Sequence, residues 1–110
     1  MRDQRIIVYQ HPNPHMKSFI TYIEISTYRV EHFKRPLGEN AQDALSKLGP
    51  IGSHVVKDIM KIHGVEEIYI KPKEIRMKKD VISSWREIEK RVFEILNAAL
   101  RRKEMRLIKG

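Results

Sequence analysis

Five histidines are the side chains of this sequence best suited to metal or acid–base chemistry: His11, His15, His32, His54 and His63. His11 and His15 have the i, i+4 spacing that binds zinc on a helix, but the prolines at positions 12 and 14 exclude a helix between them. No H-E-x-x-H pattern occurs. Two interpretations stay open: a pair of loop histidines, one of them hydrogen-bonded to backbone, and a metal-binding site.

No group of side chains has the pattern of a catalytic centre. Ser53 and His54 are adjacent, but a triad needs a third group that orients the histidine, and no G-x-S-x-G elbow occurs. Glu66 and Glu67 are neighbours on a predicted strand and point to opposite faces, whereas paired catalytic carboxylates converge. P-loop and G-x-G-x-x-G motifs are absent. The sequence therefore predicts a protein that is not an enzyme.

Composition narrows the classes further. The 110 residues include no cysteine, which excludes disulfides, thiolate zinc sites and direct ligation of an iron–sulfur cluster by cysteine. Lys and Arg number 22 and Asp and Glu 14, so the formal charge is 22 − 14 = +8. A basic chain of this kind favours anionic partners, although a solvated lysine-rich surface gives the same composition.

One predicted hairpin concentrates this positive charge. Lys71, Lys73 and Arg76 lie on it, followed by two more lysines at positions 78 and 79, with Tyr69 nearby. RNA-binding sheets combine stacking aromatics with such cations, so an RNA-binding or DNA-binding domain is one hypothesis. The RNP1 pattern is missing, and lysines on a solvated edge strand also deter aggregation.

The location of the protein can be predicted from what the sequence lacks. Its first six residues do not resemble a signal peptide, and no apolar run approaches the roughly 18 residues of a membrane span. We therefore expect a cytoplasmic protein without membrane contact.

Apolar periodicity predicts the elements that must position these residues. Strands are expected at 5–9, 17–25 and 28–33, and a hairpin at 65–71 and 74–78. A short helix begins after Asn40 and ends at Gly49-Pro50, and a second helix runs from a Ser53 cap to about His63. Ser84 and Glu87 form a capping box for the last helix, after which residues 105–110 are predicted to be a frayed tail.

This order, β-β-(β)-α-α-β-β-α, predicts the fold class. Short connections favour antiparallel pairing, so we expect an α+β domain in two layers, a mainly antiparallel sheet covered on one face by the two longer helices. Residues 1–104 are predicted to form this single domain.

Three landmarks in order resemble the N-terminal domain of Nfu/NifU-type iron–sulfur scaffold proteins. The segment H-P-N-P-H-M-K-S-F at 11–19 resembles the family's P-N-P loop, and residues 55–65, ending in Gly64-Val65, resemble its helix before a strand pair. The hairpin at 68–79 and Trp85 at a helix start complete the match. The chain departs from the family where Lys71 replaces a glycine and Lys73 an aspartate, and its stretch from Thr27 to Lys47 is longer and more charged.

The resemblance implies a function. In such proteins the cluster binds to a separate C-terminal domain with a C-x-x-C motif, and this sequence has no cysteine. It implies an interaction domain in iron–sulfur cluster assembly or delivery, which binds a protein partner of that machinery while the partner carries the cluster. The residues we expect to contact the partner are His11, Asn13, Lys17, Lys71, Lys73 and Arg76.

Overall fold

A computed structural model describes residues 5–27 and 30–109. In chain order its elements are β1 (Ile6–Gln10), β2 (Met16–Thr21), β3 (Glu31–Lys34), α1 (Ala41–Ser46), α2 (Gly49–Met60), β4 (Val65–Lys71), β5 (Glu74–Lys79) and α3 (Trp85–Lys109). This is the predicted order, and the fold is α+β as expected.

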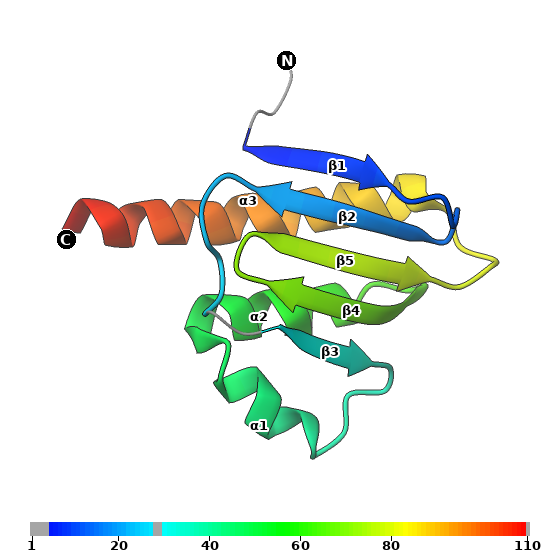
Figure 1. Ribbon diagram of the computed structural model, residues 1–110, viewed down its shortest axis with the longest axis horizontal. Helices are drawn as coiled ribbons and strands as arrows, with labels where there is room; N and C mark the ends of the chain where they lie inside the picture. The colour runs from blue at the N-terminus through cyan, green and yellow to red at the C-terminus, as the bar shows by residue number, and fades with distance from the viewer. Residues whose placement is uncertain (1–4, 28–29, 110) are drawn as a thin grey trace.

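The five strands form one antiparallel sheet in the order β1-β2-β5-β4-β3. Helices α2 and α3 lie behind the sheet in Figure 1, so the face turned toward the viewer is not covered by a helix. We call this the open face. The prediction of one helix-covered face is therefore confirmed.

Alternation along the strands separates the two faces. Register places Phe19, Ile75 and Ile70 side by side across β2, β5 and β4, and all three side chains are fully buried. Val92 and Leu96 of α3 are also fully buried in this core. The strand positions between them, such as Arg76 and Tyr69, belong to the open face.

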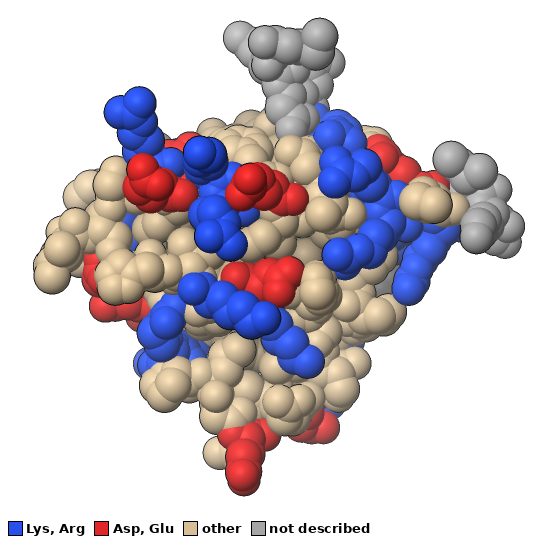
Figure 2. All heavy atoms as spheres, turned by 180° about the vertical axis from the view of Figure 1, so that it is seen from behind, with Lys and Arg blue, Asp and Glu red and all other residues tan. Residues whose placement is uncertain are grey.

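Figure 2 shows the helix side of the molecule, where cations gather toward the C-terminal half of α3. The cations of that helical segment include Arg101, Arg102, Lys103 and Arg106. Cations near a helix C-terminus interact favourably with the helix dipole.

The predicted helix boundaries need correction. Gly49-Pro50 does not end the first helix but begins α2, with the proline in the first turn. Proline suits that place because a first-turn N–H has no acceptor within the helix. Ser53 consequently lies inside α2 and is not its cap, and no side-chain cap bonds at Asn40.

Two other element boundaries differ from the prediction. β2 ends at Thr21 rather than residue 25, and its Thr21 hydroxyl donates to the Ile23 carbonyl as the chain turns away from the sheet. α3 continues to Lys109, so residues 105–109 of the predicted tail are helical. Part of the strand expected at 28–33 lies outside the described residues, and β3 begins at Glu31.

Arg35 fastens the end of β3 to the end of α2. Its guanidinium donates to the carbonyls of Val65 and Ile62, each at 2.8 Å, and to that of Met60. The last carbonyls of a helix have no partner within it, so a donor from the end of β3 satisfies them.

Candidate partner-binding surface

The six residues predicted to contact a partner do not form one site. His11, Asn13 and Lys17 lie at the end of the sheet where the β1–β2 loop is located. Lys71 and Lys73 lie at the opposite end, at the β4–β5 turn, and Arg76 lies on the open face between them. Figure 1 shows the two ends on the right and on the left of the sheet.

Side chains hold the β1–β2 loop in one conformation. The Gln10 amide donates to the carbonyls of His11, Asn13 and Met16 at 3.0, 3.3 and 3.0 Å. The Asn13 side-chain oxygen accepts the backbone N–H of His15 at 2.9 Å. The loop is therefore ordered before any partner arrives, which lowers the entropic cost of binding.

Trp85 fastens this loop to the start of α3. Its indole Nε1 donates to the Pro14 carbonyl at 2.7 Å. The Lys17 ammonium lies 5.3 Å from the centre of the Trp85 ring and forms an ion pair with Glu89. The Lys17 ammonium is therefore occupied by contacts within the chain, which connect β2 to Trp85 and α3.

His11 belongs to a hydrogen-bonded chain of three side chains. Its Nε2 lies 2.8 Å from the Ser18 hydroxyl, which donates to Glu74 at 2.7 Å. Because the single hydroxyl hydrogen goes to Glu74, His11 must be the donor to Ser18. A nucleophilic triad instead has histidine between the other two, and Ser18 is buried. The arrangement is suited to holding the loop rather than to acyl transfer.

The β5–α3 connection lies beside the β1–β2 loop. The Lys79 N–H donates to the His15 carbonyl at 2.9 Å and Trp85 donates to the Pro14 carbonyl, so this connection is bonded to the loop at both of its ends. Between them Val81 and Ile82 are 75% and 90% exposed. We call the surface formed by residues 11–16 and 80–85 the P-N-P end.

Asp80 fixes the conformation of this exposed apolar pair. Its carboxylate accepts the backbone N–H groups of Ser83 at 2.7 Å and Ile82 at 3.2 Å. These bonds, with that from Ser83 the largest, hold the pKa of Asp80 below its usual value. Val81 and Ile82 were not among the predicted contact residues, although two apolar residues between an aspartate and the serines before a helix are an available signal.

Gly64 allows the chain before β4 to approach Asp80 and Ser83 of the P-N-P end closely. Its φ is +99°, and its carbonyl accepts the N–H of Asp80 at 2.8 Å. A Cβ added there would lie 2.3 Å from the Ser83 hydroxyl oxygen. A glycine suits this position after α2 because it adopts a positive φ without steric cost.

The open face holds a stack of three side chains. The rings of His32 and Tyr69 are parallel within 3° with centres 4.0 Å apart, and the Arg76 guanidinium carbon lies 4.6 Å from the Tyr69 ring. His32 and Arg76 come from the strands on either side of Tyr69, so both faces of its ring are covered. Tyr69 has no free face on which a base could stack.

Glu67 anchors the outer part of this stack. Its carboxylate lies 2.8 Å from His32 Nε2 and 3.7 Å from the Lys78 ammonium. The bond with His32 is the main cause that lowers the pKa of Glu67, and Lys78 adds to it. Lys79 points away from this face and is buried, so the predicted basic ribbon of the hairpin is divided between two faces.

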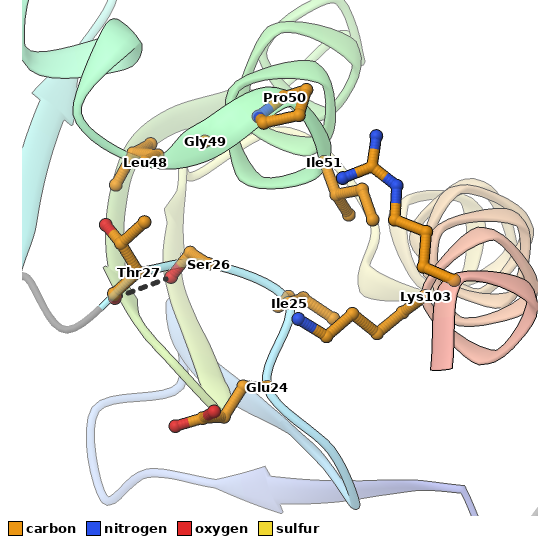
Figure 3. Close-up of a pocket in the computed structure, with 10 residues that line it drawn as sticks. Glu24, Ile25, Ser26, Thr27, Leu48, Gly49, Pro50, Ile51 and Lys103 are labelled. Atoms are coloured by element: carbon orange, nitrogen blue, oxygen red, sulfur yellow. Dashed lines mark hydrogen bonds between the residues drawn. The ribbon is translucent and has the colours of Figure 1, made fainter. Parts of the chain in front are cut away.

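We call the end of the sheet that has the β4–β5 turn the turn end. A cavity of about 330 Å³ lies there, between the β2–β3 connection, the start of α2 and the late turns of α3. It is lined by residues 24–27 and 48–51 and by Lys103 and Arg106. Figure 3 shows Lys103 extending from α3 toward Ile25. The cavity adds two cations to an end of the sheet that already has Lys71 and Lys73.

Within the described ranges, no three His, Asp or Glu side chains come together as a metal site would require. His11 is bonded to Ser18, and the buried Nδ1 of His15 has no hydrogen-bond partner. Among those same residues, no helix combines the length and the apolar character of a membrane span.

Solved structures with a similar fold are known. The chain has a TM-score of 0.66 and 19% identity to a NifU-like protein from Saccharomyces cerevisiae, covering 92% of this chain and 84% of that one. It has a TM-score of 0.62 and 16% identity to protein SAV1430 from Staphylococcus aureus, covering 84% of this chain and 99% of that one. No curated protein sequence matches it.

The sequence also matches a family model along most of its length. The model describes the N-terminal part of the scaffold protein Nfu/NifU and matches residues 6–103. This match includes the β1–β2 loop, the β4–β5 hairpin and Trp85, which were the landmarks of the resemblance. The chain therefore belongs to the Nfu/NifU N-terminal domain family.

Proposed function

We propose that this chain is a non-enzymatic accessory domain in iron–sulfur cluster assembly or delivery. It binds a protein partner through the P-N-P end, and the partner carries the cluster. Membership of the Nfu/NifU N-terminal family relates the chain to iron–sulfur assembly. The absence of cysteine supports the division of labour, because this chain has no thiolate to ligate iron.

One observation carries the choice of surface. Val81 and Ile82 expose 75% and 90% of their area on a segment that Asp80 holds in place. Beside them the exposed Pro12, Asn13 and Pro14 extend the same surface. Apolar side chains that are already fixed in place supply binding energy when they are buried, at low entropic cost.

The nucleic-acid alternative has no comparable support. Its proposed stacking residue, Tyr69, is covered on both faces by His32 and Arg76. Lys78 is close to Glu67, and Lys79 is buried. The hairpin cations therefore do not form one continuous strip that could follow a phosphate backbone.

A titration monitored by NMR tests the proposal. The ¹⁵N-labelled chain is mixed with a cluster-loaded scaffold domain that has a C-x-x-C motif. We expect the largest amide shift changes at Asn13, His15, Val81 and Ile82, since Pro12 and Pro14 have no N–H to observe. In Val81→Asp/Ile82→Asp the affinity should fall at least about tenfold, which corresponds to ~1.4 kcal/mol, because two apolar anchors are lost.

Leu107→Asp provides the matched control, since Leu107 is exposed and lies on α3 far along the chain from the P-N-P end. This variant should bind as the parent does. Shift changes confined to α3, or equal losses in both variants, would contradict the proposed surface. Full activity of cluster-dependent enzymes in cells that lack the protein would contradict the assigned role.

A further inference from the structure

β1 is an edge strand whose outward hydrogen-bonding groups can be identified. The Tyr22 N–H donates to the Arg5 carbonyl at 3.1 Å, and the His11 N–H donates to the Met16 carbonyl at 3.3 Å. Antiparallel pairs alternate between bonded and non-bonded, so Ile7 and Tyr9 also bond to β2. The N–H and C=O groups at positions 6, 8 and 10 therefore point away from the sheet.

This edge lacks the features that usually prevent strand pairing. Charged side chains and proline protect natural edges. The other edge, β3, has Glu31, His32 and Lys34 and is followed by Pro36. β1 reads I-I-V-Y-Q, with no charge and no proline.

We propose that β1 pairs with β1 of a second copy of this chain, antiparallel, about a two-fold axis through Val8. In this register Val8 lies opposite Val8 and Ile6 lies opposite Gln10 of the other copy. The outward groups at positions 6, 8 and 10 then meet only outward groups, because this register places each even-numbered residue opposite an even-numbered residue of the other copy. Each pair exchanges two hydrogen bonds, and two five-stranded sheets become one continuous sheet.

Side chains on the open face agree with this register. Ile7 lies opposite Tyr9 of the other copy, on both sides of the axis. Ile7 is 61% exposed and Tyr9 51% exposed, and an aliphatic–aromatic pair is favourable at a non-bonded position across strands. A second copy covers both residues at once, which is the ground for choosing it over an unrelated peptide.

Charge also fits a second copy at this edge. The axis brings no charged strand residue of one copy opposite another, since β1 has none. Each copy still has a net charge of +8, so the remaining repulsion acts at longer range and is screened by salt. A single short strand buries little area, so pairing depends on protein concentration and strengthens as ionic strength rises.

This inference is independent of the proposed function. Antiparallel pairing places the two β1–β2 loops at opposite ends of the shared strand pair. Both P-N-P ends would then remain accessible, and the dimer would present two of them.

Sedimentation equilibrium of the intact chain, from about 10 µM to 1 mM and at low and high salt, tests the pairing. Ile7→Lys and Tyr9→Glu should each weaken dimerisation at least about tenfold. An equimolar mixture of the two variants should recover it, because the introduced lysine of one copy then faces the introduced glutamate of the other across the axis. Leu107→Lys, at a site that is also 61% exposed, should dimerise as the parent does.

The absence of cysteine allows a second test of the register. A mixture of Ile7→Cys and Tyr9→Cys should form a mixed disulfide dimer on mild oxidation. Each variant alone should not, because its two cysteines lie diagonally, about 7–8 Å apart, beyond disulfide reach. A chain that stays monomeric throughout, dimers that the β1 variants leave unchanged, or equal crosslinking of all mixtures would overturn the proposal.

Discussion

The P-N-P end and the turn end of the sheet differ in what their side chains are bonded to. At the P-N-P end, Asp80 and Trp85 bond to backbone groups, as the neighbouring Gln10 does, and the apolar side chains of Val81 and Ile82 are exposed. At the turn end the backbone is bonded, since the Lys73 carbonyl accepts the Thr21 N–H at 2.8 Å, but the cations face solvent.

This difference separates a shaped surface from a charged one. Polar side chains that bond inward fix the loops and leave apolar groups outside, which suits a specific protein contact. Solvated lysines such as Lys71 and Lys73 contribute to the net charge but fix no geometry. If this comparison is right, substitutions at the P-N-P end should cost more stability than matched ones at the turn end.

The two glycines with positive φ give the largest expected contrast. Gly64→Ala should destabilise the chain by about 3 kcal/mol, because an alanine there is strained and meets Ser83. Gly49→Ala, with φ +83° and its nearest contact at 3.6 Å, should cost only about 1–2 kcal/mol for backbone strain. Urea unfolding of both variants measures the difference in unfolding free energy, and equal losses would contradict the proposed contrast between the two ends.

Trp85→Phe removes the indole donor and keeps an aromatic ring. We expect a loss of about 1–2 kcal/mol, since the Pro14 carbonyl loses its partner and some apolar contact goes with it. NMR shifts of residues 12–15 should change at the same time. Unchanged loop shifts would mean that Trp85 does not hold this loop.

Lys17 and Lys71 allow a charge comparison. Lys17→Met should cost about 1–2 kcal/mol, because it leaves the part-buried Glu89 carboxylate without its ion pair. Lys71→Met, at an exposed site of the turn end, should stay within about 0.5 kcal/mol of the parent. Thermal unfolding at pH 7 decides, and a larger loss at Lys71 would reverse the proposed contrast.

Asp80 gives the smallest expected effect, and one that depends on pH. Its pKa is lowered in the folded chain, so its contribution to stability is present above the unfolded pKa of about 3.9 and is lost as pH falls through the folded pKa. In Asp80→Asn the decline of stability below about pH 4 should be shallower than in the parent. Chemical unfolding between neutral and acid pH measures this, and parallel curves would show that Asp80 is not coupled to folding.

Local patterns in the sequence were sufficient for much of the fold. Periodicity predicted the hairpin at 65–71 and 74–78 and the order of strands and helices, and the structure has both. The serine cap of α3 is confirmed, although Ser84 accepts the N–H of Arg86 and no bond from Glu87 returns. The Gly49-Pro50 boundary failed because the same dipeptide can end one helix or begin the next, and only the packing of α2 decides.

The candidate surface was predicted only in part. His11 and Asn13 were predicted to contact a partner; the structure places both in a fixed loop, and the contact itself stays a prediction. Lys17 was expected to face a partner but pairs with Glu89, which is 72 residues away in the chain. No local pattern reveals such a partner, because the pairing depends on how α3 crosses the sheet.

Residue types and their spacing over a few positions were enough to predict the order of strands and helices, the net charge and the lack of thiolate chemistry. Which side chains remain exposed could be read only from the folded chain. Strand order brings residues 11–16 and 80–85 together and leaves β1 at an edge. Exposure and pairing depend on contacts between distant segments, and these exist only once the chain is folded.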